Sequence, residues 1–144
     1  MFLTWSDKDC PANYVFKGDD DIFINPFLLE DFTSKENATV PAVYGCQLGG
    51  QPPERKPGSR YADFKWPESI YPKYISGGGF LMNRAAAAVL RTQIPLTPVI
   101  TIDDALIGIA MARAGHPGFG FPRRPETLVF TSKNRRPTYF HFFD

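Results

Sequence analysis

Three consecutive aspartates, Asp19 to Asp21, constrain this chain more than any other feature. They follow Asn13–Lys17, a segment rich in β-forming residues that predicts a buried strand running into a loop. Like charges at such a place repel one another, so something must offset the repulsion. Alternate carboxylates in a strand-end loop can face one side, which makes Asp19 and Asp21 a hard-oxygen site for Mn²⁺ or Mg²⁺ shared with substrate phosphates. A solvated acidic turn is the alternative.

A second acidic pair, Asp103 and Asp104, begins a predicted helix that Gly115 ends. Thr101 is placed to cap this helix, with Asp104 at the third helical position, as in a capping box. Structural capping alone would therefore explain the pair. The functional alternative is a general base that takes the proton from an attacking hydroxyl group; the helix dipole would keep it ionised but weak.

Three glycines, Gly77 to Gly79, interrupt a predicted strand over residues 74–82. Glycine inside a strand costs conformational entropy and offers no side chain to pack. The usual reason is the close approach of another backbone or of a ligand, and a simple bulge is the alternative. Asn83 then caps a predicted alanine-rich helix from Arg84 to Thr92.

The remaining pattern predicts one α/β domain over the 144 residues. The apolar pattern resumes at Ile22–Ile24, and the other predicted elements are a helix from about Pro26 to Phe32 capped by Asn25, a strand at Ala42–Cys46 and a surface loop from Gly49 to Pro57. Periodicity is poor from His116 to Asp144, where no element is assigned.

Composition excludes several function classes. A net charge of +1 leaves no basic face for nucleic acid. Cys10 and Cys46 lack the spacing of a zinc site, and they either pair with each other or remain free thiols. No apolar run approaches the roughly 20 residues of a membrane span, and the N-terminus lacks the plan of a signal peptide. Asn37-Ala38-Thr39 is an N-glycosylation sequon, which matters only in the secretory pathway.

In their order and spacing these segments resemble the β1,3-glycosyltransferase family of galactosyl- and N-acetylglucosaminyltransferases, over residues 10–117. The matching pieces are Cys10-Pro11 with Tyr14 to Asn25, Tyr71-Pro72-Lys73-Tyr74 with Gly77 to Phe80, and Ile102-Asp103-Asp104 with Gly108. Lys17-Gly18 before the aspartates and Ile102-Asp103-Asp104 are more similar to the N-acetylglucosaminyltransferase branch than to the galactosyltransferase branch.

The resemblance implies a GT-A fold, with a Rossmann-like mixed sheet flanked by helices. It also implies an inverting transferase that moves a sugar, above all N-acetylglucosamine (GlcNAc), from a UDP donor to the 3-hydroxyl of an acceptor glycan, using Mn²⁺ or Mg²⁺. The roles carried over are the metal at Asp21 and Asp19, the donor at Asp19, Asp20, Asp21 and Gly77, Gly78, Gly79, the base at Asp104, and the acceptor at Asp103 and Trp66. The family's metal-binding His has only His141 as a candidate here. Aromatic core packing is the alternative role of Trp66.

Family members carry a signal anchor, a stem and N-terminal strands that build part of the uridine pocket, and the comparison of motifs leads us to expect that residues 1–144 do not include them. The expectation is a partial catalytic domain over residues 1–144 with a divergent tail at 118–144. The longer protein is expected at the lumenal face of the Golgi membrane, attached only through that anchor, with Asn37 glycosylated. The pattern indicates no oligomeric state.

Three alternatives to GlcNAc transfer stay open from the sequence. The first is a UDP-galactose β1,3-galactosyltransferase. The second is a non-catalytic fragment or relative that binds a glycan or a protein partner. The third, a divalent-cation protein unrelated to sugar transfer, explains Asp19 to Asp21 but neither the glycine-rich strand nor the acidic helix start.

Overall fold

The computed structural model describes residues 2–116 and 129–131. Its elements are, in chain order, α1 (Phe2–Lys8), β1 (Tyr14–Gly18), β2 (Ile22–Ile24), α2 (Pro26–Lys35), β3 (Val43–Leu48), β4 (Tyr74–Asn83), α3 (Arg84–Gln93), the short 3₁₀ helix η1 (Ile94–Leu96), α4 (Asp103–Arg113) and β5 (Val129–Thr131). The expected mixed α/β class is confirmed.

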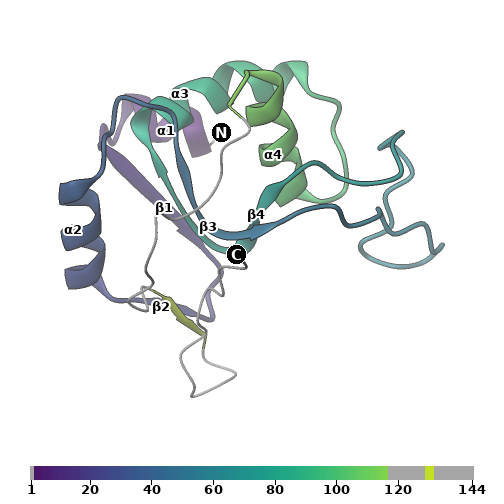
Figure 1. Cartoon of the computed structure of the whole chain (residues 1–144), viewed down its shortest axis with the longest axis horizontal. Coiled ribbons are helices and arrows are strands. Elements are labelled where there is room, and N and C mark those ends of the chain that lie inside the picture. The colour runs from purple at the N-terminus through teal and green to yellow at the C-terminus, as the bar shows by residue number, and fades with distance from the viewer. Residues whose placement is uncertain (1, 117–128, 132–144) are drawn as a thin grey trace.

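Strand β4 is the centre of the main sheet, which has the order β1-β4-β3 (Figure 1). Both pairings are antiparallel, and Gly18 of β1 lies opposite Gly79 of β4. A separate antiparallel pair joins β2 to β5, with Ile22 opposite Thr131. Because these ladders are all antiparallel, the GT-A arrangement expected from the resemblance stays a prediction.

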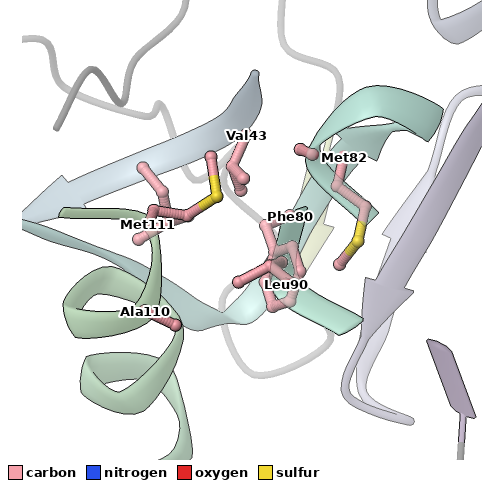
Figure 2. Close-up of a cluster of buried hydrophobic side chains, with 8 residues drawn as sticks. Val43, Phe80, Met82, Leu90, Ala110 and Met111 are labelled. Carbon is pink, nitrogen blue, oxygen red and sulfur yellow. The ribbon is translucent and has the colours of Figure 1, made fainter. Parts of the chain in front are cut away.

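The core lies where α3 and α4 pack against the sheet (Figure 2). Its buried members are Val43, Ile75, Phe80, Met82, Ala86, Leu90, Ala110 and Met111. A second buried cluster consists of Tyr71, Tyr74, Ile100, Ala105 and Ile109 and joins the start of β4 to α4. The alanines bring backbones close together, since small side chains permit dense packing of helix on sheet. The first turn of α4 is thereby held against β4.

Asn83 joins β4, α3 and the segment before β3, and it is fully buried. Its Oδ1 accepts hydrogen bonds from the backbone N–H groups of Ala86 (2.9 Å) and Ala42 (3.1 Å). Its Nδ2 donates to the carbonyl oxygens of Val40 (2.6 Å) and Asn37 (3.2 Å). The predicted cap is confirmed, and the same side chain also anchors a segment some forty residues away.

Two elements extend at least two residues beyond their predicted C-terminal ends. Helix α2 continues past Phe32 to Lys35, where Lys35 Nζ lies 2.6 Å from Asp31 Oδ2 one turn earlier. Its predicted cap is confirmed, because Asn25 Oδ1 accepts from the first free N–H groups of the helix. Strand β3 runs to Leu48 rather than Cys46, across a register shift between Gly45 and Gln47 that keeps it paired with β4.

Residues 49–73 form the connection between β3 and β4, which is longer than the predicted surface loop; we call it loop 49–73.

Cys10 is exposed and Cys46 half-buried, and both are free thiols. Within residues 2–116 and 129–131, no helix is long and apolar enough to cross a membrane.

Replacing Asn83 tests the junction. We expect Asn83→Ala to lower the free energy of unfolding by about 3 kcal/mol or more, because it removes a helix cap and leaves several buried backbone groups without partners. The control is Asn25→Ala at the start of α2, a helix without buried residues, where a loss of about 1 kcal/mol is expected. Chemical denaturation measures both. Equal losses would show that Asn83 acts as an ordinary cap.

Candidate functional site

The three acidic and glycine-rich segments meet at one end of the sheet. The backbone N–H of Asp19, just after β1, donates to the carbonyl oxygen of Gly78 at 3.1 Å. On α4, Asp104 Oδ2 accepts from the backbone N–H of Gly77 at 2.6 Å. The central strand therefore holds the acidic loop through one glycine and the acidic helix start through the next. Segments more than eighty residues apart in sequence form one site.

Lys17 lies between the two acidic segments. Its Nζ donates to the carbonyl oxygen of Gly77 at 3.1 Å and lies 3.9 Å from both Asp19 Oδ1 and Asp103 Oδ2. Exposed ion pairs at this distance contribute little to stability, but they do lower the repulsion between carboxylates. No role was predicted for Lys17 from the sequence. The signal available there was a single lysine separated from the acidic run only by Gly18.

Gly77 is a glycine because a carboxylate occupies the space of its side chain. A Cβ at this position would lie 2.0 Å from Asp104 Oδ1. The φ angle does not require glycine, since only Gly50, Gly58 and Gly115 among the described glycines have positive φ. At Gly78 the nearest atom to such a Cβ is Ser76 Oγ at 3.8 Å, so that position is open. A close approach was expected here, and the neighbour is a side chain of the same chain.

Asp104 has an unusual carboxyl group. Burial raises its pKa to about 6, the N–H of Gly77 opposes that rise, the charge of Asp103 adds to it, and Lys17 opposes it. The sequence predicted a weak base, ionised by the helix dipole. The structure corrects this, because burial outweighs the stabilising contacts and makes Asp104 a stronger base than an ordinary aspartate.

The predicted capping box at α4 is wrong. The helix begins at Asp103 with Ile102 at the N-cap position, and no side chain caps it. Thr101 Oγ1 donates instead to the carbonyl oxygen of Ala62 in loop 49–73, at 2.8 Å. Asp104 is thus the second helical residue. Because its carboxylate is turned to Gly77, helix capping does not explain why an acidic residue stands there.

The metal-binding role of the aspartates after β1 stays a prediction. Asp19 and Asp20 are exposed and Asp21 is half-buried. Within the described part of the chain, no group of three or more His, Cys, Asp or Glu side chains is placed to hold a metal ion. A Mn²⁺ or Mg²⁺ site that uses one or two carboxylates and completes its shell with phosphates and water does not need such a group. His141 lies outside the described residues.

Two other predicted site residues, Trp66 and Asn37, make their contacts within their own segments of the chain. Trp66 is half-buried, stacks on Tyr71 with ring centroids 6.0 Å apart, and donates through Nε1 to the carbonyl oxygen of Ile70 at 2.8 Å. Asn37 is exposed, and its Oδ1 accepts from the N–H (2.9 Å) and hydroxyl (2.7 Å) of Thr39. Trp66 therefore belongs to the packing of loop 49–73, and the sequon is accessible.

A cavity of about 340 Å³ adjoins the charged cluster. Apolar side chains from α1, β4, α3 and α4 line most of it, and Lys17 and Asp103 also contribute. Ligand pockets in proteins are commonly apolar with a few polar groups that fix orientation. A mostly apolar cavity thus adjoins the acidic site on the side of the sheet that the helices cover.

Comparisons with known proteins place this arrangement in context. The family model described as galactosyltransferase matches residues 1–117. A rat UDP-GlcNAc:betaGal beta-1,3-N-acetylglucosaminyltransferase 7 is 34% identical over 126 residues, which cover 82% of this chain and 32% of the relative. A human acetylgalactosaminyl-O-glycosyl-glycoprotein beta-1,3-N-acetylglucosaminyltransferase is 35% identical over 116 residues, 78% of this chain and 30% of the relative. The chain thus spans about a third of the length of these curated relatives.

Substituting Gly77 tests the contact that positions Asp104. We expect Gly77→Ala to displace the Asp104 carboxylate toward solvent, so that its pKa falls from about 6 toward the roughly 3.9 of an ordinary aspartate. Carbon-13 NMR of the carboxyl group across a pH titration measures this. Gly78→Ala is the matched control, because its Cβ enters open space. The proposed contact is refuted if Asp104 titrates alike in both variants.

Proposed function

The chain belongs to the galactosyltransferase family, and from that premise we propose that it is the catalytic part of a metal-dependent, inverting β1,3-N-acetylglucosaminyltransferase. Its donor would be UDP-GlcNAc, and its acceptor the 3-hydroxyl of a galactose that ends a glycan. The observation that carries this proposal is the Asp104 carboxylate, which is held against Gly77 at 2.6 Å beside the Asp19–Asp21 loop.

Asp104 is proposed as the general base. A base works best when its pKa is near the working pH, and burial brings that of Asp104 to about 6. Its carboxylate would accept the proton of the acceptor 3-hydroxyl while that oxygen attacks the anomeric carbon from the face opposite UDP. This displacement inverts the anomeric centre. Asp103, exposed on the same helical turn, would contact the acceptor.

Asp21 and Asp19 would hold the metal against the donor diphosphate, with Asp20 assisting on the donor side. Bound Mn²⁺ or Mg²⁺ supplies neutralisation of the charge that develops on the UDP leaving group. Lys17 lowers the repulsion between the acidic loop and the start of α4, since its Nζ lies 3.9 Å from the carboxylates of both Asp19 and Asp103. The open space at Gly78 supports close approach of the donor sugar to β4.

The proposed donor sugar rests on the names of the relatives. The rat and human relatives are both beta-1,3-N-acetylglucosaminyltransferases, and such names favour GlcNAc over galactose. We place the protein at the lumenal face of the Golgi membrane, where glycan-building transferases work, with Asn37 as a glycosylation site. A non-catalytic fragment is the second candidate, since the chain spans about a third of its relatives.

Calorimetric titration with UDP tests the nucleotide site. We expect UDP to bind the chain in the presence of Mn²⁺, and Asp21→Ala to weaken that binding at least about tenfold, a loss of roughly 1.4 kcal/mol, because a metal ligand is removed. Asp31→Ala on α2, an exposed aspartate paired with Lys35, is the control and should bind like the parent. A folded chain that binds no UDP would favour the non-catalytic candidate.

Asp104→Asn tests the base. We expect transfer to fall by about 10²–10⁴, with UDP binding unchanged, since the amide accepts no proton. In the parent, transfer should fall as pH drops through about 6. An Asp104→Asn variant with parental transfer would exclude this residue as the base.

The same variant has a predicted effect on stability. The folded pKa of Asp104 lies above its ordinary value of 3.8, so ionisation of Asp104 destabilises the fold as pH rises through about 6. At pH 7 we expect Asn at this position to raise the free energy of unfolding by about 1 kcal/mol or less, because solvent screens a half-buried group. Below pH 3.8 the advantage should vanish. Urea denaturation at both pH values measures the difference.

A further inference from the structure

Loop 49–73 is built around a buried carboxylate. Asp63 is fully buried, and its carboxylate accepts from the backbone N–H groups of Lys65 (2.9 Å) and Trp66 (3.2 Å) and from the hydroxyl of Tyr71 (2.5 Å). Burying a charge is unfavourable unless hydrogen bonds replace its water. These bonds do so, and they fix the conformation of the loop, which projects from the ends of β3 and β4 in Figure 1.

Arg55 also stabilises the conformation of loop 49–73, through hydrogen bonds to its backbone. Its guanidinium donates to the carbonyl oxygens of Asp63, Trp66 (2.6 Å) and Glu68 (3.3 Å). A planar guanidinium with several fixed donors is suited to hold several carbonyl groups at once. Loop 49–73 is long and contains no helices or strands. These hydrogen bonds and the stacking of Trp66 on Tyr71 nevertheless give it a defined conformation at the surface.

Two aromatic rings of this ordered loop face solvent. Phe64 is 63% exposed and Tyr61 49% exposed, whereas their neighbours Trp66 and Tyr71 pack inward. The guanidinium of Arg60 lies 4.4 Å over the ring of Tyr61, which orients that ring. Exposed aromatic side chains on a rigid support are typical of a recognition surface.

The position of these rings relative to the base follows from Thr101. Its hydroxyl donates to the carbonyl oxygen of Ala62, the residue between Tyr61 and Asp63. Asp104 follows Thr101 by three residues, a separation of at most about 11 Å between Cα atoms. The exposed rings are therefore tied to the segment that leads directly into the acidic start of α4, within the span of a short oligosaccharide.

We propose that Tyr61 and Phe64 form an outer acceptor subsite, on which sugars lying beyond the residue being extended stack their apolar ring faces. A pyranose offers a C–H face to an aromatic ring and hydroxyl groups to the charged side chains around it, here Arg60 and Lys65. Two rings among charged residues offer far less apolar area than the roughly 800 Å² per partner of a stable protein interface. The subsite rests on the proposed function and gives it a preference for long acceptors.

The test is an NMR titration with lactose and with a tetrasaccharide that ends in β-galactose, read at the ring protons of Tyr61 and Phe64. We expect the tetrasaccharide to shift these signals and to bind more tightly than lactose. The double variant Tyr61→Ala/Phe64→Ala should lose about tenfold in tetrasaccharide affinity and little in lactose affinity. Phe27→Ala, which removes a 79% exposed ring from α2, should leave both affinities unchanged.

The readout separates this subsite from the proposed function, because it needs neither turnover nor donor. Absence of tetrasaccharide binding, or equal losses for both acceptors in the double variant, would overturn the subsite. UDP and Mn²⁺ binding would then still stand as the test of the transferase. Ring-dependent tetrasaccharide binding in a chain that binds no UDP would support the subsite while removing the transferase.

Discussion

Strand β4 exchanges backbone hydrogen bonds with β1 on one edge and β3 on the other, and the site depends on that double pairing. A strand that is paired on both edges cannot shift in register without breaking two sets of backbone hydrogen bonds. The side chains and the glycines of β4 therefore keep fixed positions. Gly77, which has no side chain, consequently leaves space that the Asp104 carboxylate occupies. The carbonyl oxygen of Gly78 accepts a hydrogen bond from the backbone N–H of Asp19 in the acidic loop. At its far end, Asn83 ties the same strand to α3.

Local chemistry was predictable from the sequence, and long-range partners were not. Asn25 and Asn83 were predicted as helix caps because a side chain needs only the next three residues to cap a helix. Thr101 failed the same reasoning, since its hydroxyl bonds a carbonyl 39 residues away. Likewise, the glycines signalled a close approach, but only the packing of α4 on β4 identifies Asp104 as the neighbour of Gly77.

The charged residues show the same difference between local features, which the sequence reveals, and long-range contacts, which it does not. Carboxylates in two separated segments were visible as candidates in the sequence, and the fold brings both segments to β4. Their shared cation, Lys17, needed the fold to be recognised, because its two acidic neighbours come from different ends of the site. The degree of burial of Asp104 also depends on tertiary contacts, so the sequence could suggest a base but not its strength.

The order of the strands has a consequence for synthesis. Strand β1 leaves the ribosome before its partner β4, which follows only after β2, α2, β3 and loop 49–73. At translation rates of about 5–20 residues per second, β1 waits several seconds with unsatisfied backbone groups on the edge that β4 will pair. Edges of this kind invite pairing with other chains. The charge of Asp19–Asp21 directly after β1 would oppose such pairing between identical nascent chains until β4 has emerged, because like charges at a strand edge disfavour edge-to-edge contact.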